Sequence, residues 1–165
     1  MPEKETIERA RRDKREGKAP TTQAGEFIRE EMHHIREGKH GARCAKQAIA
    51  IGLSKARSAG VELPPPEKGE ASEKTRKSAQ RAYARGHGAP PLRRPSAKRS
   101  RAIRTALKRE GHRAASHDAL SRQAHSAAGK RTATERSAAA KKAARTKGPA
   151  ERSAAAKKAA RTRAR

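Results

Sequence analysis

Three histidines and the single cysteine stand close together in the sequence and are the first candidates for metal chemistry. They are His33, His34, His40 and Cys44, and imidazole and thiolate groups are ligands that zinc prefers. Adjacent histidines point about 100° apart on a helix, however, and the segment contains neither a C-x-x-C nor an H-E-x-x-H pattern. We therefore predict polar helix and loop positions for the histidines, a small apolar contact for Cys44, and neither a metal nor another cofactor.

The basic side chains are the second group with a defined chemistry. The chain of 165 residues carries 43 Lys and Arg against 17 Asp and Glu, a net charge of +26. Residues 1–62 contribute only +4, whereas residues 63–165 contribute +22. A surplus of this size repels itself unless a polyanion neutralises it. We therefore expect a nucleic-acid partner that contacts the C-terminal part, duplex DNA in the first place and RNA as the alternative.

The twelve-residue phrase ERSAAAKKAART occurs twice, at residues 135–146 and 151–162. Alanine has the highest helix propensity and Lys and Arg come close to it, but isolated helices of about 12–15 residues are marginal in water. We predict that the copies are mostly unfolded alone and become helical along a nucleic acid. Contacts of Lys and Arg to phosphates position a protein without reading the base sequence, so binding with little sequence preference is expected.

The predicted phosphate-binding residues lie on the repeats and on the basic segments before them. The loop PPLRRPS resembles an arginine hook for the minor groove, but it lacks a glycine between its arginines, so we expect it to bind the backbone. The predicted residues are Arg93, Arg94, Lys98, Arg99, Arg101, Arg104, Lys108, Arg109, Arg136, Lys141, Lys142, Arg145, Lys147, Arg152, Lys157, Lys158, Arg161 and Arg163.

Two amphipathic helices are predicted between residues 21 and 60. Ile28, Met32 and Ile35 form an apolar stripe at helical spacing, and a second stripe follows between residues 44 and 56. Thr21 or Thr22 can cap the first helix, Gly38 can end it, and Gly60 suits the end of the second. With a short connection between them, the two helices predict an αα-hairpin, and a homodimer formed through it is an option.

The apolar composition argues against one large core. Only 15 residues are Ile, Leu, Val, Met or Phe, against 36 alanines, and ordering each residue costs about 1–2 kcal/mol of backbone entropy. We therefore predict an all-α chain that is largely extended or disordered, with one small αα-hairpin and short basic Ala-rich helices without a common core. The predicted parts are a solvated N-terminal helix (1–18), the hairpin (19–63), a Pro-rich linker (64–71) and a basic tail (72–165).

Two resemblances accompany these patterns. The AAAKKAAR phrases and Gly-Pro spacing of residues 98–165 resemble the tails of linker histones and of bacterial histone-like nucleoid proteins, which implies DNA binding and compaction. The segment EFIREEMHHIREGKHGARCAKQAIAIGLSKARSAG resembles a family of small uncharacterised bacterial proteins often labelled DNA-binding. No functional residue is carried over from either.

The expected function is therefore that of a histone-like, nucleoid-associated DNA-binding protein and not of an enzyme. Gly-rich phosphate loops and nucleophile motifs are missing from the sequence. No apolar run suits a signal peptide or a membrane span, so we expect a cytoplasmic protein at the nucleoid. Two alternatives remain: an RNA- or ribosome-associated basic protein, and a stress or interaction protein whose hairpin binds a protein partner.

Overall fold

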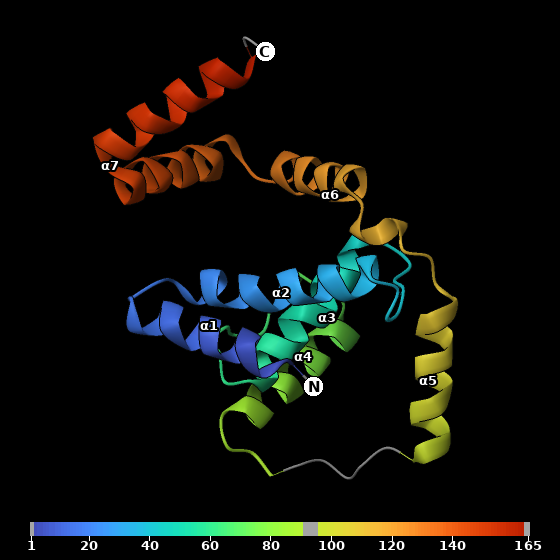
Figure 1. Cartoon of the computed structure of the whole chain (residues 1–165). Helices are drawn as coiled ribbons and strands as arrows, with labels where there is room; N and C mark the ends of the chain where they lie inside the picture. The colour runs from blue at the N-terminus through green and yellow to red at the C-terminus, as the bar shows by residue number, and fades with distance from the viewer. Residues whose placement is uncertain (1, 91–95, 164–165) are drawn as a thin grey trace. The chain divides into compact units, whose positions relative to one another are not determined.

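A computed structural model describes residues 2–90 and 96–163 of the chain. The chain divides into two compact units, Met1–Ser121 and Arg122–Arg165, each of which is described by itself. The described residues form seven α-helices and one short 3-10 helix (Figure 1): α1 (Lys4–Arg15), α2 (Pro20–Arg36), α3 (Ala45–Ser58), α4 (Glu73–Gly86), α5 (Ala97–Arg109), η1 (Arg113–Ala115), α6 (His117–Gly129) and α7 (Ala133–Arg163).

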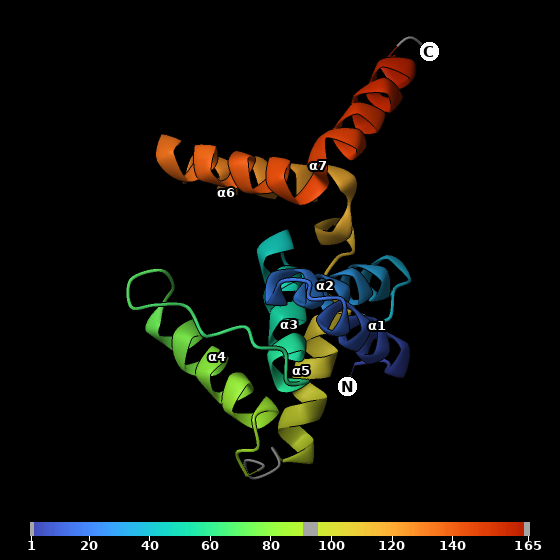
Figure 2. The ribbon, with the colours of Figure 1, turned by 90° about the vertical axis from the view of Figure 1, so that its left-hand side faces the viewer.

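Helices α2 and α3 pack closely against each other as the two arms of a helical hairpin (Figure 2). Gly52 of α3 makes this approach possible, because a Cβ atom there would lie only 2.8 Å from the Cα atom of Ile28 on α2. Helix α2 ends before Gly38, whose φ of +74° is favourable for glycine. The hairpin therefore depends on two glycines, one at the turn and one at the helix contact.

Two further helices cover the hairpin, α1 on α2 and α4 on α3. The prediction that residues 1–18 form a solvated helix is wrong, because α1 buries Thr6, Ala10 and Asp13. Arg9 Nε of α1 also donates a 2.7 Å hydrogen bond to Glu26 Oε2 of α2. Helix α4 buries Ala79 and Ala82, although the sequence pattern placed it in the basic tail.

The core consists of two clusters that share α2. One joins Met32 and Ile35 to buried alanines of α3 and η1, and the other joins Phe27 to Ala10, Ala56 and other small residues. Ten of the 14 buried hydrophobic residues among the described parts are alanines. The all-α prediction is confirmed, but an extended or disordered chain without a common core is wrong. The prediction failed because it counted only large apolar side chains as core residues, whereas buried alanines also form a core by letting helix backbones approach closely.

The helix ends show which local signals act. Val61 N–H donates to the carbonyl of Ala56 and Gly60 N–H to that of Arg57, the paired hydrogen bonds of a Schellman motif, and Gly60 has a φ of +87°. Ser96 caps α5 with its side chain. Neither Thr21 nor Thr22 caps α2, because that helix begins one residue earlier at Pro20, after Ala19. Proline is favourable in the first turn since its missing N–H needs no partner there.

The chain returns to the hairpin after α5. Gly41 N–H donates to the carbonyl of Leu107 and Ala42 N–H to that of Gly111, at 2.9 and 3.2 Å. Ala114 and Ala115 of η1 are buried against α2 and α3, and Arg36 Nε donates to the carbonyl of Ala115. The first unit therefore extends well past the Pro-rich linker at residues 64–71.

The repeated phrases form helix α7, so the prediction that they are mostly unfolded alone is also corrected. Thr132 and Glu135 form a capping box at its start: Glu135 N–H donates to Thr132 Oγ1, and Thr132 N–H donates to Glu135 Oε2. Gly148, with a φ of +64° and a ψ of 171°, interrupts the helix before Pro149. Helix α7 therefore consists of two straight halves, one for each copy of the phrase (Figure 1).

A candidate nucleic-acid interface and a buried histidine–carboxylate cluster

Helix α5 exposes all six of its predicted phosphate-binding residues. Lys98, Arg101, Arg104 and Lys108 follow one another at spacings of three and four residues, so they share one side of the helix. Ile103 and Leu107 lie toward the other side, and Ile103 is 54% exposed. Ser96 starts the helix by accepting a hydrogen bond from the backbone of Arg99. Helix α5 therefore has one basic side, and the side chain of Ser96 caps its first turn.

Helix α7 exposes its ten predicted cations, eight within the two repeats and two, Lys147 and Arg163, directly after them. In the first half of α7, Lys141, Lys142 and Arg145 share one side of the helix, while Arg136 and Lys147 lie on the opposite side. The second copy repeats this arrangement sixteen residues later. The cations therefore surround each half, and alanines fill the spaces between them.

Two arginines of α7 are partly engaged with the backbone. Arg136 donates to the carbonyl of Arg131 at 3.1 Å, and Arg152 donates to the carbonyl of Gly148 at the same distance.

Hydrogen bonds from the backbone and side chain of Thr132 hold the pKa of Glu135 below its ordinary value. That carboxylate remains charged at the start of the helix, where a negative charge is favourable.

The remaining predicted contacts, Arg93 and Arg94, lie outside the described residues. Among the residues that are described, no ion pair involves a cation of α5 or α7; such pairs elsewhere include Lys55 with Glu31 and Arg76 with Glu73. The sixteen described cations of these two helices are thus available to a partner.

A second candidate site lies inside the hairpin. Glu31 on α2 is fully buried, and its carboxylate lies 3.2 Å from His40 Nε2 and 2.7 Å from Lys55 Nζ. The nearby Glu30 is also buried, and its Oε1 lies 3.2 Å from the same ammonium group. Neither oxygen of Glu31 makes a hydrogen bond of good geometry with any described residue. The carboxylate is close to cationic and imidazole groups but incompletely satisfied.

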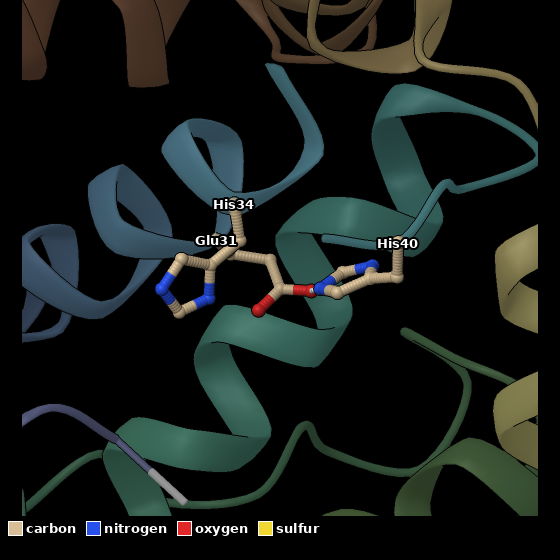
Figure 3. A group of neighbouring side chains, drawn as sticks. All are labelled: Glu31, His34 and His40. Carbon is tan, nitrogen blue, oxygen red and sulfur yellow. Dashed lines mark ion pairs between the residues drawn. The ribbon is translucent and has the colours of Figure 1, made fainter. Parts of the chain in front are cut away.

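Glu31, His34 and His40 lie together, as Figure 3 shows. One ligand atom from each side chain can be chosen such that all three lie within 4.8 Å of one another. Glu31 and His34 are three residues apart on α2 and therefore share a face, while His40 comes from the loop that leads to α3. These three residues could hold a metal ion.

The structure separates the other two metal candidates of the sequence from this cluster. His33 is exposed and pairs with Glu37 at 3.0 Å, and Cys44 is exposed as the residue before α3. The three-residue spacing of Glu31 and His34 could have indicated from the sequence that both side chains share one face of a helix. A sequence search for histidines and cysteines alone overlooks it, because the carboxylate is the residue at the centre.

Within the described parts of the chain, none of the helices is both long enough and apolar enough to cross a membrane.

The comparisons with known proteins concern the hairpin region. No curated protein and no solved structure matches the chain. Residues 15–68 match a family described as a family of unknown function (DUF6496). The matched segment runs from the last residue of α1 through α2 and α3 and includes Glu31, His34, His40 and Lys55. The chain is thus similar to this family over the helical hairpin, and the helices that carry most of its positive charge lie beyond the match.

Proposed function

We propose that this protein binds nucleic acid through phosphate contacts from α5 and from both halves of α7, with duplex DNA as its main partner. The observation that supports this most is the set of sixteen exposed Lys and Arg side chains on two helices with no acidic partner among the described residues. Such contacts release the counterions condensed on the phosphates and bind with little regard to base sequence.

The two halves of α7 suit this function as linked elements. Each half contains about 15 residues, which corresponds to a helix of about 22 Å, and each repeats the same cations. Linking two weak binding elements makes the second contact intramolecular and raises the overall affinity. Binding of this kind would coat and compact DNA and would place the protein at the nucleoid.

The test compares two triple variants of equal charge change in the full chain. One replaces Lys141, Lys142 and Arg145 of α7 by Gln, and the control replaces Arg11, Arg12 and Arg15 of α1, which are exposed too. Duplex binding is measured by fluorescence anisotropy over a salt series. Because each neutralised phosphate contributes about 0.9 to the slope of log K against log salt, the α7 variant is expected to lower that slope by about 2 to 3.

The α1 variant is expected to leave both affinity and slope close to those of the unmodified protein. Equal losses in the two variants would mean that net charge alone attracts DNA, and an unaffected α7 variant would contradict the proposal. A structured RNA hairpin is titrated in parallel at the same salt concentrations. Tighter binding to the RNA would assign the basic helices to an RNA-associated protein instead.

A further inference from the structure

We propose that Glu31, His34 and His40 form a binding site for a divalent transition-metal ion of the zinc type, inside the hairpin and separate from the basic helices. Two imidazole nitrogens and one carboxylate oxygen are a ligand set that Zn²⁺ accepts, with a fourth position for water. The proposal rests on the orientation of the histidines, on the charge balance of the buried groups and on the path by which an ion can enter.

In both histidines one ring nitrogen faces Glu31, and the other lies within hydrogen-bond distance of an oxygen outside the cluster. His34 Nε2 lies 2.8 Å from Glu3 Oε1, which accepts its hydrogen, so Nδ1 is the nitrogen that remains on the side of Glu31 (Figure 3). His40 Nδ1 lies 3.1 Å from the carbonyl of Gly41, which leaves Nε2 directed at Glu31. Metal-binding histidines commonly have their second nitrogen fixed by a carboxylate or a backbone carbonyl.

The charges around the cluster leave a negative charge to be balanced. The side chains of Glu30 and Glu31 are 2% and 0% exposed, and a single ammonium group, that of Lys55, lies between them. A buried carboxylate is costly unless it is paired and hydrogen-bonded, yet neither oxygen of Glu31 has a well-directed hydrogen bond within the described residues. A divalent ion at Glu31 would supply the missing charge, and Lys55 would remain paired with Glu30.

The position of the cluster gives the ion both an entrance and a structural effect. His40 is 21% exposed and belongs to the loop between α2 and α3, so an ion can approach from that side. The three ligand atoms already lie within 4.8 Å of one another, and zinc bonds of about 2.0–2.2 Å require only that the side chains close in. Bound metal would fasten the loop to α2 and stabilise the hairpin.

The test uses the full chain and Zn²⁺ alone, titrated by isothermal calorimetry in a buffer that does not bind zinc. We expect one ion per chain and a thermal unfolding midpoint that rises with zinc concentration. The variants His34→Gln and His40→Gln are expected to bind at least about 100-fold more weakly, and Glu3→Gln, which alters an outer contact, about 10-fold more weakly. His33→Gln is the matched control, because it removes a neighbouring exposed histidine, and it is expected to bind as the unmodified chain does.

Circular dichroism establishes that each variant is folded, and zinc X-ray absorption of the unmodified chain provides a result that depends on no variant. A first shell that contains two imidazoles is expected. The proposal is overturned if the folded chain binds no stoichiometric zinc, if His33→Gln weakens binding as much as His34→Gln, or if the absorption spectrum contains no pair of imidazole ligands. None of these outcomes decides whether α5 and α7 bind DNA, which is tested separately.

Discussion

The smallest side chains decide how closely the helices of the first unit approach. Gly52 meets the backbone of Ile28 on α2, and Gly86 of α4 lies so near the carbonyl of Arg57 that a Cβ atom would come within 2.0 Å of it. Buried alanines then fill the spaces between the helices, among them Ala48 and Ala56. Close packing of small residues replaces the large apolar side chains that this chain lacks, since dispersion contacts accumulate wherever atoms fit closely.

The substitution Gly52→Ala tests this packing. The added methyl group would lie 2.8 Å from the Cα atom of Ile28, a backbone atom, and overpacking of this kind costs about 1–3 kcal/mol. Gly25→Ala on α2 is the matched control, because no atom lies within 4 Å of its added methyl group, and replacing a mid-helix glycine stabilises by about 0.5–1 kcal/mol. Urea unfolding of both variants measures the two changes in the free energy of unfolding. If Gly52→Ala stabilises the protein as Gly25→Ala does, close packing at Gly52 does not limit stability.

Helix α1 is held to α2 by polar contacts at its N-terminal end. The backbone N–H of Glu3 donates to Glu30 Oε2 at 3.3 Å, and the carboxylate of Glu3 accepts from His34 Nε2. Hydrogen bonds first from His34 and then from Lys39 lower the pKa of Glu3 from its ordinary value of 4.5. The charged form of Glu3 is therefore the form that binds α1 to the end of α2.

The variant Glu3→Gln tests this contact through its pH dependence. A lowered pKa in the folded state means that the contribution of Glu3 is present above its ordinary pKa of 4.5 and is lost as the pH falls through the lowered value. The unmodified chain should therefore lose more stability on acidification than Glu3→Gln does. Thermal unfolding in metal-free buffer, from neutral pH down to about pH 3, follows the difference. Parallel curves would show that the Glu3 contact contributes nothing to stability.

The two units of the whole molecule differ in what stabilises them. Met1–Ser121 contains both hydrophobic clusters, whereas residues 122–165 carry 14 Lys and Arg, two acidic residues and no Val, Leu, Ile or Met. A helix without a packed face depends on backbone propensity and on screening of its charges. The first unit is therefore expected to unfold cooperatively and the second gradually.

Fragments of residues 1–121 and 122–165 test this difference. The first is expected to show one sharp thermal transition with the midpoint of the full chain, because its core is complete. The second is expected to lose helicity gradually on heating, because its helices have no packed core. Circular dichroism measures both, and a sharp transition in the second fragment or its absence in the first would contradict the expectation.

Local signals in the sequence were sufficient for much of the secondary structure. The glycine at residue 60, the cap at Ser96 and the break at Gly148 and Pro149 act through the conformation and hydrogen bonds of a few neighbouring residues, so they can be read without knowing the fold. The start of α2 was misread because two threonines follow the true first residue, Pro20. The exposure of the cations on α5 and α7 also follows from composition, since side chains of this kind are rarely buried.

The association of the helices required the tertiary structure. Nothing in the alanine pattern distinguishes Ala114 and Ala115, which are buried against α2 and α3, from the alanines of α7, which are not buried. The same holds for Glu31. It lies three positions before His34 in the sequence, but only the loop after α2 and the packing of α3 bring His40 and Lys55 to its carboxylate. The amino-acid sequence thus determined the position of most helices, several of their ends and the distribution of charge, because these depend on neighbours in the chain. Which small residues form a core, and which acid lies among histidines, depends on contacts between distant segments, and only the packed helices decide them.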